Sequence, residues 1–300
     1  MALIDLHLHS NKSDGEYPPG QVVRLAYDAG LLVMALTDHD TTDGIDEALA
    51  AASEVSEENR GGADGAVAGF KCLPGIEITT AHAREQHILG YLIHYDKPSF
   101  RSFTKRLLAM RRERAYNILE YLNKNGIPIS YEQIRRSSAS EDDYIGRPQI
   151  ASEMIRRGYA GSVSEVFRTY FTGEEFRAVP RPKPSAEESI SEIRAAGGVA
   201  VLAHPYSIGL RGPAFAAHLK TLKGQGLEGI ECHYGIYTPE ETRDCARLAD
   251  SLGLIVTGGS DFHGPHIKPG VHIATGKDGM LDFDDMSSVE RIEAIARGRM

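Results

Sequence analysis

Apolar, β-branched runs recur along the chain, and most of them end in a histidine or a carboxylate. The runs are LIDLHLHS, LVMALTDHD, LPGIEIT, GGVAVLAHP and LIVTGGSDFH. Such runs predict buried strands, and segments with apolar residues at helical spacing between them predict helices. Strands are expected at 3–8, 31–36, 72–79, 87–92, 199–203 and 254–259, and helices at 19–29, 45–55, 185–196 and 238–252.

Helix boundary signals support this alternation. Thr238, Pro239 and Glu241 have the spacing of an N-cap, a first helical residue and a reciprocal cap, and Ser185 with Glu188 repeats the motif. The polar, Gly-rich stretch at 57–69 is expected to be a surface loop. Strands that alternate with helices favour parallel pairing and right-handed crossovers. The sequence therefore predicts a (β/α) barrel of seven or eight strands.

The pattern changes to helices alone between residues 98 and 184. The stretch LLAMRRERAYNILEYLNKNGIP has a helical apolar period, and IASEMIRRGYA and SVSEVFRTYF predict two further helices. We expect barrel parts at 1–97 and 185–300 and a helical cap inserted at 98–184, with VPRPKP as its return hinge. The insert carries 16 Lys and Arg against 10 Asp and Glu, whereas the whole chain has a net charge of −9. An acidic body thus carries a basic insert.

Composition changes this picture little. The chain has 300 residues, of which 41% are hydrophobic and 25% charged, as in ordinary globular proteins. No stretch approaches the roughly 18 apolar residues of a membrane span, and the N-terminus has no leader pattern, so a cytoplasmic protein without membrane partners is expected. Three widely spaced cysteines suit a reducing compartment and are interpreted as small core residues.

Nine candidate metal ligands lie near the predicted strand ends. In parallel βα folds this edge is where ligands meet. Side chains alternate along a strand, so His7 and His9 point to the same side, as do Asp261 and His263. Imidazole and carboxylate ligands suit Zn, Mn or Fe. The nine are His7, His9, Asp14, His39, Glu77, His87, His204, Asp261 and His263.

Neighbouring residues suggest supporting roles. Asp5, Asp38 and Asp40 are expected to orient ligand imidazoles by accepting their second N–H, although a helix cap is an equal alternative for Asp40. Arg147 is the first candidate for binding a substrate phosphate, because Gly146 and Pro148 place it at a helix start. The second choices near the hinge are Arg177, Arg181 and Lys183, and the arginines interpreted as ordinary exposed helix charges are Arg111, Arg112, Arg114, Arg156 and Arg157.

Two further residues are candidates for contact with substrate. The stretch GLEGIECHY predicts a further strand with His233 at its end, and this histidine is expected to touch substrate or pass a proton to the leaving group. Tyr206, just after AHP, is a comparable candidate.

The motifs DLHLHS, SDG, TDHD, GIEIT, HILGY, GRP, AHP and SDFH, in this order, resemble the PHP (polymerase and histidinol phosphatase) phosphoesterases over essentially the whole chain. The helical insert with GRP resembles the stand-alone branch that acts on nucleotides and related sugar phosphates. The resemblance implies a distorted (β/α)7 barrel with three divalent metal ions. Gln149 departs from the pattern, since the branch usually has histidine after GRP.

The resemblance also implies a division of the ligands. His7, His9, Glu77 and Asp261 would hold the first ion. Glu77, His87 and His204 would hold the second, and Asp14, His39 and His263 the third. Glu77, Asp261 and His263 would act in catalysis through the hydroxide that the metals hold.

These features favour a metal-dependent phosphatase that releases inorganic phosphate from nucleotides, such as nucleoside monophosphates or 3′,5′-bisphosphates, by attack of a metal-bridging hydroxide. One alternative is a phosphodiesterase that opens a cyclic sugar phosphate, cleaving one or both ester bonds, or trims short RNA ends. Another is a barrel that binds metal or serves as a scaffold without catalysis. The last is a C–N hydrolase of the amidohydrolase type, which shares the opening His-x-His.

Overall fold

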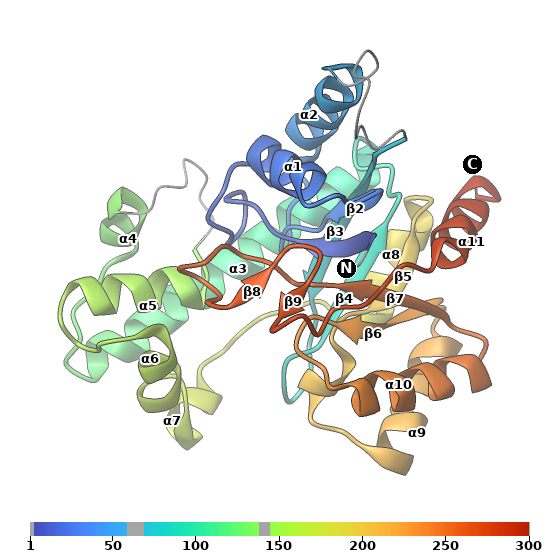
Figure 1. The fold of residues 1–300 in the computed structure, drawn as a ribbon. Helices are drawn as coiled ribbons and strands as arrows, with labels where there is room; N and C mark the ends of the chain where they lie inside the picture. Colours follow the sequence, from blue (N-terminus) through green and yellow to red (C-terminus); the bar gives the residue numbers. More distant parts are fainter. Residues whose placement is uncertain (1–2, 59–68, 138–144, 300) are drawn as a thin grey trace.

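The computed structural model describes residues 3–58, 69–137 and 145–299. In this part of the chain one sheet of seven strands follows the sequence order (Figure 1). The strands are β1 (Ile4–Leu8), β2 (Val33–Leu36), β3 (Lys71–Thr79), β4 (His87–Tyr91), β5 (Val199–Leu202), β6 (Gly229–Tyr234) and β7 (Ile255–Gly259). The first and last strands meet, since the N–H of Asp261 donates to the carbonyl of His7 at 2.8 Å. The sheet is therefore a nearly closed barrel, which confirms the predicted fold class.

Strand β4 runs against both of its neighbours, whereas the other strands pair in parallel. The expectation of parallel strands is wrong here, because only residues 80–86 join β3 to β4 and a parallel crossover needs a dozen or more. The reversal has a consequence for the site. It places His87, the first residue of β4, opposite Thr79 at the end of β3.

Helices cover the barrel (Figure 1); four of them match the expected ranges, and those at 212–224 and 286–297 were not predicted from the sequence. They are α1 (Pro19–Asp28), α2 (Ile45–Glu58), α8 (Ala186–Ala195), α9 (Gly212–Gly224), α10 (Pro239–Ser251) and α11 (Met286–Arg297). The reciprocal cap predicted between Thr238 and Glu241 is present, and the Ser185 hydroxyl accepts the N–H of Glu188. One apolar cluster joins Ile78 and Leu202 to α8, and another joins Leu89 and Val201 to α11.

In the described residues between β4 and α8, five helices gather on one side of the barrel (Figure 1). They are α3 (Pro98–Lys124), α4 (Tyr131–Ser137), α5 (Arg147–Arg156), α6 (Val163–Thr169) and α7 (Gly173–Ala178). Helices α3 to α7 contribute to one apolar cluster that includes Leu122, Ile134, Met154 and Phe176. The sequence did not predict α4 and α7, which are too short to show a helical period. The domain boundaries at 98 and 184 stay a prediction.

Three smaller elements complete the described chain: η1 (Pro205–Ile208), β8 (Val271–His272) and β9 (Gly276–Lys277). Most of the loop predicted at 57–69 lies outside the described residues. Among the helices of the described ranges, none combines the length and the apolar character that crossing a bilayer requires.

Candidate metal centre

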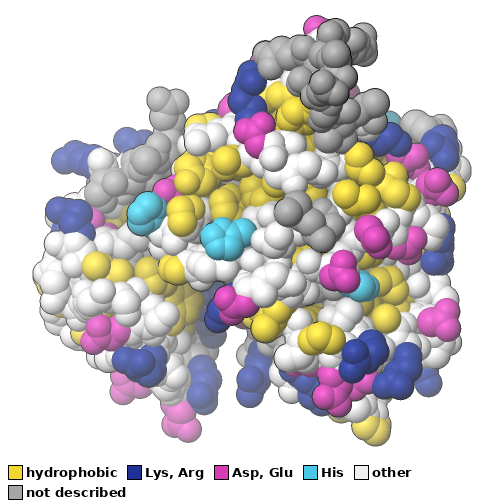
Figure 2. Space-filling model, in the orientation of Figure 1, with side chains coloured by type: hydrophobic (Ala, Val, Ile, Leu, Met, Phe, Trp, Pro, Cys, Tyr) yellow, Lys and Arg dark blue, Asp and Glu magenta, His cyan; other side chains and the backbone are white. Residues whose placement is uncertain are grey.

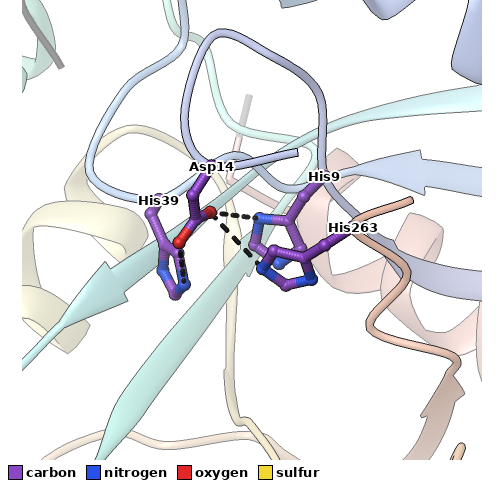
Figure 3. Close-up of side chains that lie close together, drawn as sticks. All are labelled: His9, Asp14, His39 and His263. Carbon is purple, nitrogen blue, oxygen red and sulfur yellow. Dashed lines mark ion pairs between the residues drawn. The ribbon is translucent and has the colours of Figure 1, made fainter. Parts of the chain in front are cut away.

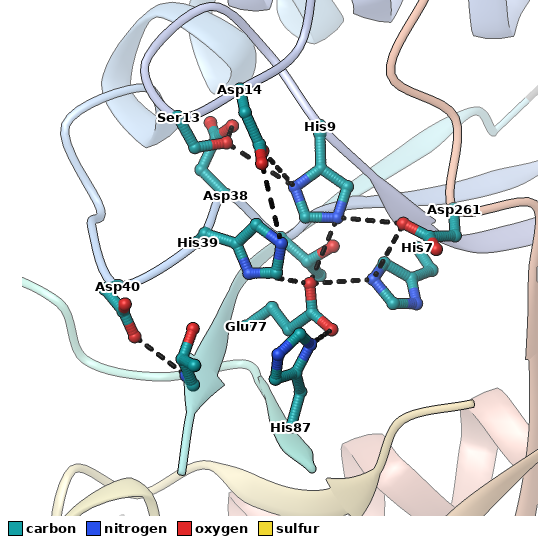
Figure 4. A network of polar contacts seen from close by, with 12 residues as sticks. His7, His9, Ser13, Asp14, Asp38, His39, Asp40, Glu77, His87 and Asp261 are labelled. Atoms are coloured by element: carbon teal, nitrogen blue, oxygen red, sulfur yellow. Dashed lines mark hydrogen bonds and ion pairs between the residues drawn. The ribbon is translucent and has the colours of Figure 1, made fainter. Parts of the chain in front are cut away.

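The nine predicted ligands converge at one edge of the barrel. His7 and His9 come from β1 and its end, Glu77 from β3 and His87 from β4. The others stand on the loops after β1, β2, β5 and β7. All are buried except His39, whose side chain is 12% exposed. Because six of the strands and their loops contribute ligands to one edge, residues far apart in sequence meet here, as Figure 4 shows for those it labels.

Their donor atoms form three overlapping groups in which all ligand atoms lie within 4.8 Å of one another. The groups are His7, His9, Glu77 and Asp261; His9, Asp14, His39 and His263, drawn in Figure 3; and His39, Glu77 and His87. His204 adjoins the last group, with its Nε2 atom 2.9 Å from Glu77 Oε1. Glu77 belongs to two groups, as do His9 and His39, and its role as a bridge between two ions stays a prediction.

The arrangement fits bound cations better than it fits a network of hydrogen bonds. Five buried atoms of the cluster have no hydrogen-bond partner within the described residues: His7 Nε2, His9 Nε2, Asp14 Oδ1, His39 Nδ1 and Glu77 Oε2. Yet Glu77 Oε2 lies 3.0 to 3.2 Å from three of the imidazole nitrogens. Buried polar atoms usually have partners. Lone pairs that converge without hydrogen-bond geometry are typical of ligands around shared ions.

Electrostatics within the cluster favour charged carboxylates. Burial opposes ionisation, but the surrounding histidines, led by His39, hold the pKa of Asp14 and of Glu77 well below its usual range. Burial also acts against protonation of His9, but the nearby carboxylates of Asp261 and Glu77, 3.3 and 3.2 Å from its Nε2 atom, outweigh it and raise the pKa of His9 to about 9. The site thus concentrates negative charge on oxygens that prefer cations as partners.

Glu231 of β6 holds two parts of the cluster and was not predicted from the sequence. Its Oε1 accepts a hydrogen bond from His7 Nδ1 at 2.9 Å, which leaves Nε2 to face the other ligands. Its Oε2 accepts the backbone N–H of His204 at 2.6 Å. The available signal was a glutamate within the apolar strand GIECHY, where a buried carboxylate needs partners.

Two residues hold Asp261 through Oδ2, the carboxylate oxygen that points away from His7 and His9. Tyr234 donates to its Oδ2 at 2.7 Å, and Lys268 forms an ion pair with the same atom. The other oxygen, Oδ1, lies 3.3 Å from His9 Nε2 and 3.6 Å from His7 Nε2. Tyr234 and Lys268 therefore orient Oδ1 toward the cluster. Neither residue was among the predicted site residues.

The expectation that Asp5, Asp38 and Asp40 orient imidazoles is wrong. Asp5 accepts backbone N–H groups, including that of Ser260 at 2.9 Å. Asp38 accepts the N–H and hydroxyl of Ser10 at 2.7 and 2.6 Å and thereby fixes the loop that carries Asp14. These carboxylates organise the backbone around the ligands rather than the rings themselves.

Asp40 joins the barrel to the helical insert. Its Oδ1 accepts the N–H of Thr79 at 2.8 Å, and its Oδ2 pairs with Arg111 and Arg114 of α3. These arginines hold the pKa of Asp40 at about 2 despite its burial. Both are only 8% exposed, so their interpretation as ordinary exposed helix charges is wrong. Asp40 also has a φ of 58°, a left-handed conformation that its several hydrogen bonds stabilise.

A cavity of about 870 Å³ lies beside the cluster, between the barrel and the insert. Asp14, Glu77 and His263 line one end, and Phe167 and Phe171 of the insert line another part. Figure 2 shows a hollow between two lobes with Lys and Arg side chains along its walls. The basic residues that line the cavity are Arg84, Arg111, Arg114, Arg147, Arg177, Arg181, Lys183 and Lys268. A cation-lined space of this size suits an anionic ligand.

The structure brings two of the four predicted substrate-binding residues to this cavity. Arg147, at the start of α5, and Arg177 of α7 line it. His233 does not, because it packs on Phe283 with ring centroids 5.2 Å apart. Tyr206 points elsewhere too, with its hydroxyl 3.4 Å from the carbonyl oxygen of Glu241. The expectation that His233 and Tyr206 contact substrate is therefore corrected, since a strand-end position alone does not show where a side chain points.

Comparisons with known proteins agree with this site. The profile of the PHP domain matches residues 5–198. The chain is 33% identical over 264 residues to a 5′-3′ exoribonuclease of Haemophilus influenzae, covering 87% of this chain and 90% of that protein. It is 31% identical over 266 residues to a 3′,5′-nucleoside bisphosphate phosphatase of Chromobacterium violaceum, covering 88% of each. A crystal structure from Bifidobacterium adolescentis, assigned as a metal-dependent phosphoesterase, matches with a TM-score of 0.79 and 28% identity, covering 97% of this chain and 96% of that one. The chain therefore belongs to the PHP domain family of metal-dependent phosphoesterases.

Proposed function

We propose that this enzyme hydrolyses small phosphate monoesters, in particular nucleotides, and releases inorganic phosphate. The observation that carries the proposal is the position of the nine converging ligands at one end of a cavity whose walls are basic. A phosphate ester carries negative charge that repels a nucleophile, and its leaving oxygen is poor. A site that concentrates cations addresses both difficulties.

The residues fit three divalent ions, and Zn, Mn and Fe all suit this donor set. His7, His9, Glu77 and Asp261 would hold the first ion. Glu77, His87 and His204 would hold the second, and Asp14, His39 and His263 the third. When bound, such ions neutralise phosphoryl charge and lower the pKa of a coordinated water.

The protein's own groups then place the substrate. Arg147 and Arg177 line the cavity, and a guanidinium can bind two phosphoryl oxygens at once. Arg147 forms an ion pair with Glu85, and both residues line the cavity together with His87 and His204 of the cluster. Glu77, Asp261 and His263 would serve catalysis by holding the ions. Substrate phosphate would thus lie between the ligands and these arginines.

A phosphodiesterase that acts on short RNA ends is the second candidate. The similarity to the exoribonuclease of Haemophilus influenzae favours it, and the cavity is larger than a single phosphate requires. A cyclic sugar phosphate, the other diester expected from the sequence, is tested together with it.

The proposal predicts the order of substrate preference. Protein loaded with Mn²⁺ should release phosphate from nucleoside 5′-monophosphates, 3′-monophosphates or 3′,5′-bisphosphates faster than it turns over any diester. The assay measures kcat/KM on these monoesters, on cyclic sugar phosphates and on short oligoribonucleotides, with separate detection of phosphate and of shortened products. A higher value on a diester than on every related monoester would replace the phosphatase by a phosphodiesterase. Loaded protein without turnover on any phosphoester would refute both.

A further inference from the structure

Asp40 directly follows the proposed ligand His39 and fastens the segment after β2 to the end of β3. Its backbone N–H donates to the carbonyl of Glu77 at 2.8 Å, and its Oδ1 accepts the N–H of Thr79 at 2.8 Å. An isolated parallel bridge pairs His39 with Glu77. One residue therefore holds two proposed ligands on neighbouring segments in register.

The second carboxylate oxygen of Asp40, Oδ2, faces α3 of the insert. It accepts hydrogen bonds from Arg111 Nε at 3.0 Å and from Arg114 Nη2 at 3.1 Å. Arg111 also donates to the Thr79 hydroxyl at 3.1 Å, and Arg114 donates to the carbonyl of Pro182 at 3.2 Å. The side chains of Arg111, Arg114 and Asp40 are only 10%, 9% and 1% exposed. Removing one partner of a buried ion pair is costly, because the other charge stays buried. The orientation of Asp40 therefore depends on α3.

We propose that Asp40 is a positioning residue for the third proposed ion, and that Arg111 and Arg114 hold it in that role. This inference rests on the proposed function for the presence of the ion. A ligand binds well only when the residues around it fix its position to within about 0.5 Å. Affinity for the third ion therefore depends on the seating of α3 on the barrel, although α3 supplies no member of the ligand groups found in the described chain. The group that contains His39 also includes His9, Asp14 and His263.

Positioning and charge alone predict opposite results for Arg111. A cation near the cluster repels a divalent ion, so on charge alone Arg111→Met should strengthen metal binding. Because Arg111 acts by holding Asp40, the same substitution should instead weaken it. Asp40→Asn removes the charge with little disturbance of the backbone. Asparagine tolerates the left-handed conformation that Asp40 adopts, with its φ of 58°, and it keeps an oxygen for the N–H of Thr79.

The test is a calorimetric titration of metal-free protein with Mn²⁺, which measures the dissociation constants of the ions without substrate. Asp40→Asn and Arg111→Met should each weaken the binding of one ion by about tenfold or more, as residues outside the ligand set commonly do, and leave the others unchanged. The double variant should lose no more than the larger single loss, because both substitutions act through one contact. Arg111→Lys keeps a cation for Asp40 and should recover most of the loss.

Arg106→Met is the matched control. Arg106 also joins α3 to the barrel, through an ion pair with Glu188 of α8, but it lies outside the ligand groups and the cavity. This variant should bind every ion as the wild type does.

Unchanged or stronger Mn²⁺ binding in Arg111→Met would overturn the inference, as would an equal loss in Arg106→Met. The titration also separates this inference from the proposed function. Selective loss of one ion in Asp40→Asn and Arg111→Met supports the positioning role even if no phosphoester is turned over. A wild type that turns over phosphoesters, with variants that bind every ion equally well, contradicts the positioning role alone. A wild type that binds no Mn²⁺ contradicts both.

Discussion

Replacing Glu77 by glutamine should lower phosphate release by at least about a thousandfold. Glu77 is fully buried, belongs to two of the three ligand groups and lies within 3.2 Å of His7, His9 and His39. Glutamine keeps the volume but removes the charge that two ions would share. Metal content per chain, measured by plasma mass spectrometry alongside kcat/KM, should fall in the same variant.

Two further substitutions of the same kind calibrate this effect. Glu231→Gln leaves every proposed ligand in place but weakens the hold on His7, so a loss of about 10- to 100-fold in metal affinity or activity is expected. Glu293→Gln removes ion pairs with Lys71 and Arg297 that lie outside the ligand cluster and its cavity, so it should leave activity unchanged. If Glu77→Gln retained both metal and turnover, the bridging role assigned to Glu77 would be wrong.

Removal of divalent metal should abolish turnover and lower thermal stability. The five buried cluster atoms without hydrogen-bond partners in the described chain would lose the cations that satisfy them. An ion present at a thousandfold excess over its Kd stabilises the fold by about 4 kcal/mol. For a chain of this length that corresponds to a rise in Tm of at least about 5 °C. Scanning calorimetry of chelator-treated and Mn-reloaded protein measures this difference.

The same comparison has an internal control. Mg²⁺ prefers oxygen ligands in octahedral geometry, so it should restore less stability than Mn²⁺ at this histidine-rich site. Full activity in chelator-treated protein that retains no metal would contradict the assignment of this chain's chemistry to bound ions.

The metal-centre residues could be predicted because the signal is local. A strand is visible as an apolar run, and its end is visible where His9, Glu77 or Asp261 interrupts the run. Parallel strands place their ends on one edge, so positions scattered over more than 250 residues meet without any knowledge of tertiary contacts. The barrel class could be predicted too, because the alternation of strands and helices is also visible locally along the chain.

The supporting residues could not be predicted, since their roles depend on contacts between distant elements. Arg111 and Arg114 share the apolar face of α3 with Leu107 and Ile118, but the sequence does not show what this face packs against, and only the packing of α3 on the barrel brings the two arginines to Asp40. Glu231 lies in the middle of a strand, where no motif distinguishes it. His233 and Tyr206 show the opposite error, because a position near a strand end does not determine which way a side chain points.

The apolar pattern of β4 does not show its direction, which depends on the length of the link that joins it to β3. HILGY has the apolar content of any buried strand, and its direction depends on the short link before it. His87 reaches the ligand edge because this strand begins there, whereas the other strands end there.

The central claim is that the converging ligands hold a multinuclear metal centre. Anomalous diffraction from crystals of Mn-loaded protein, recorded on both sides of the Mn absorption edge, tests it most directly. We expect separate peaks within the three ligand groups, with Glu77 between two of them, and no peak near Glu77 in crystals of Glu77→Gln. Crystals with full Mn content whose anomalous peaks lie away from His7, His9 and Glu77 would contradict the account.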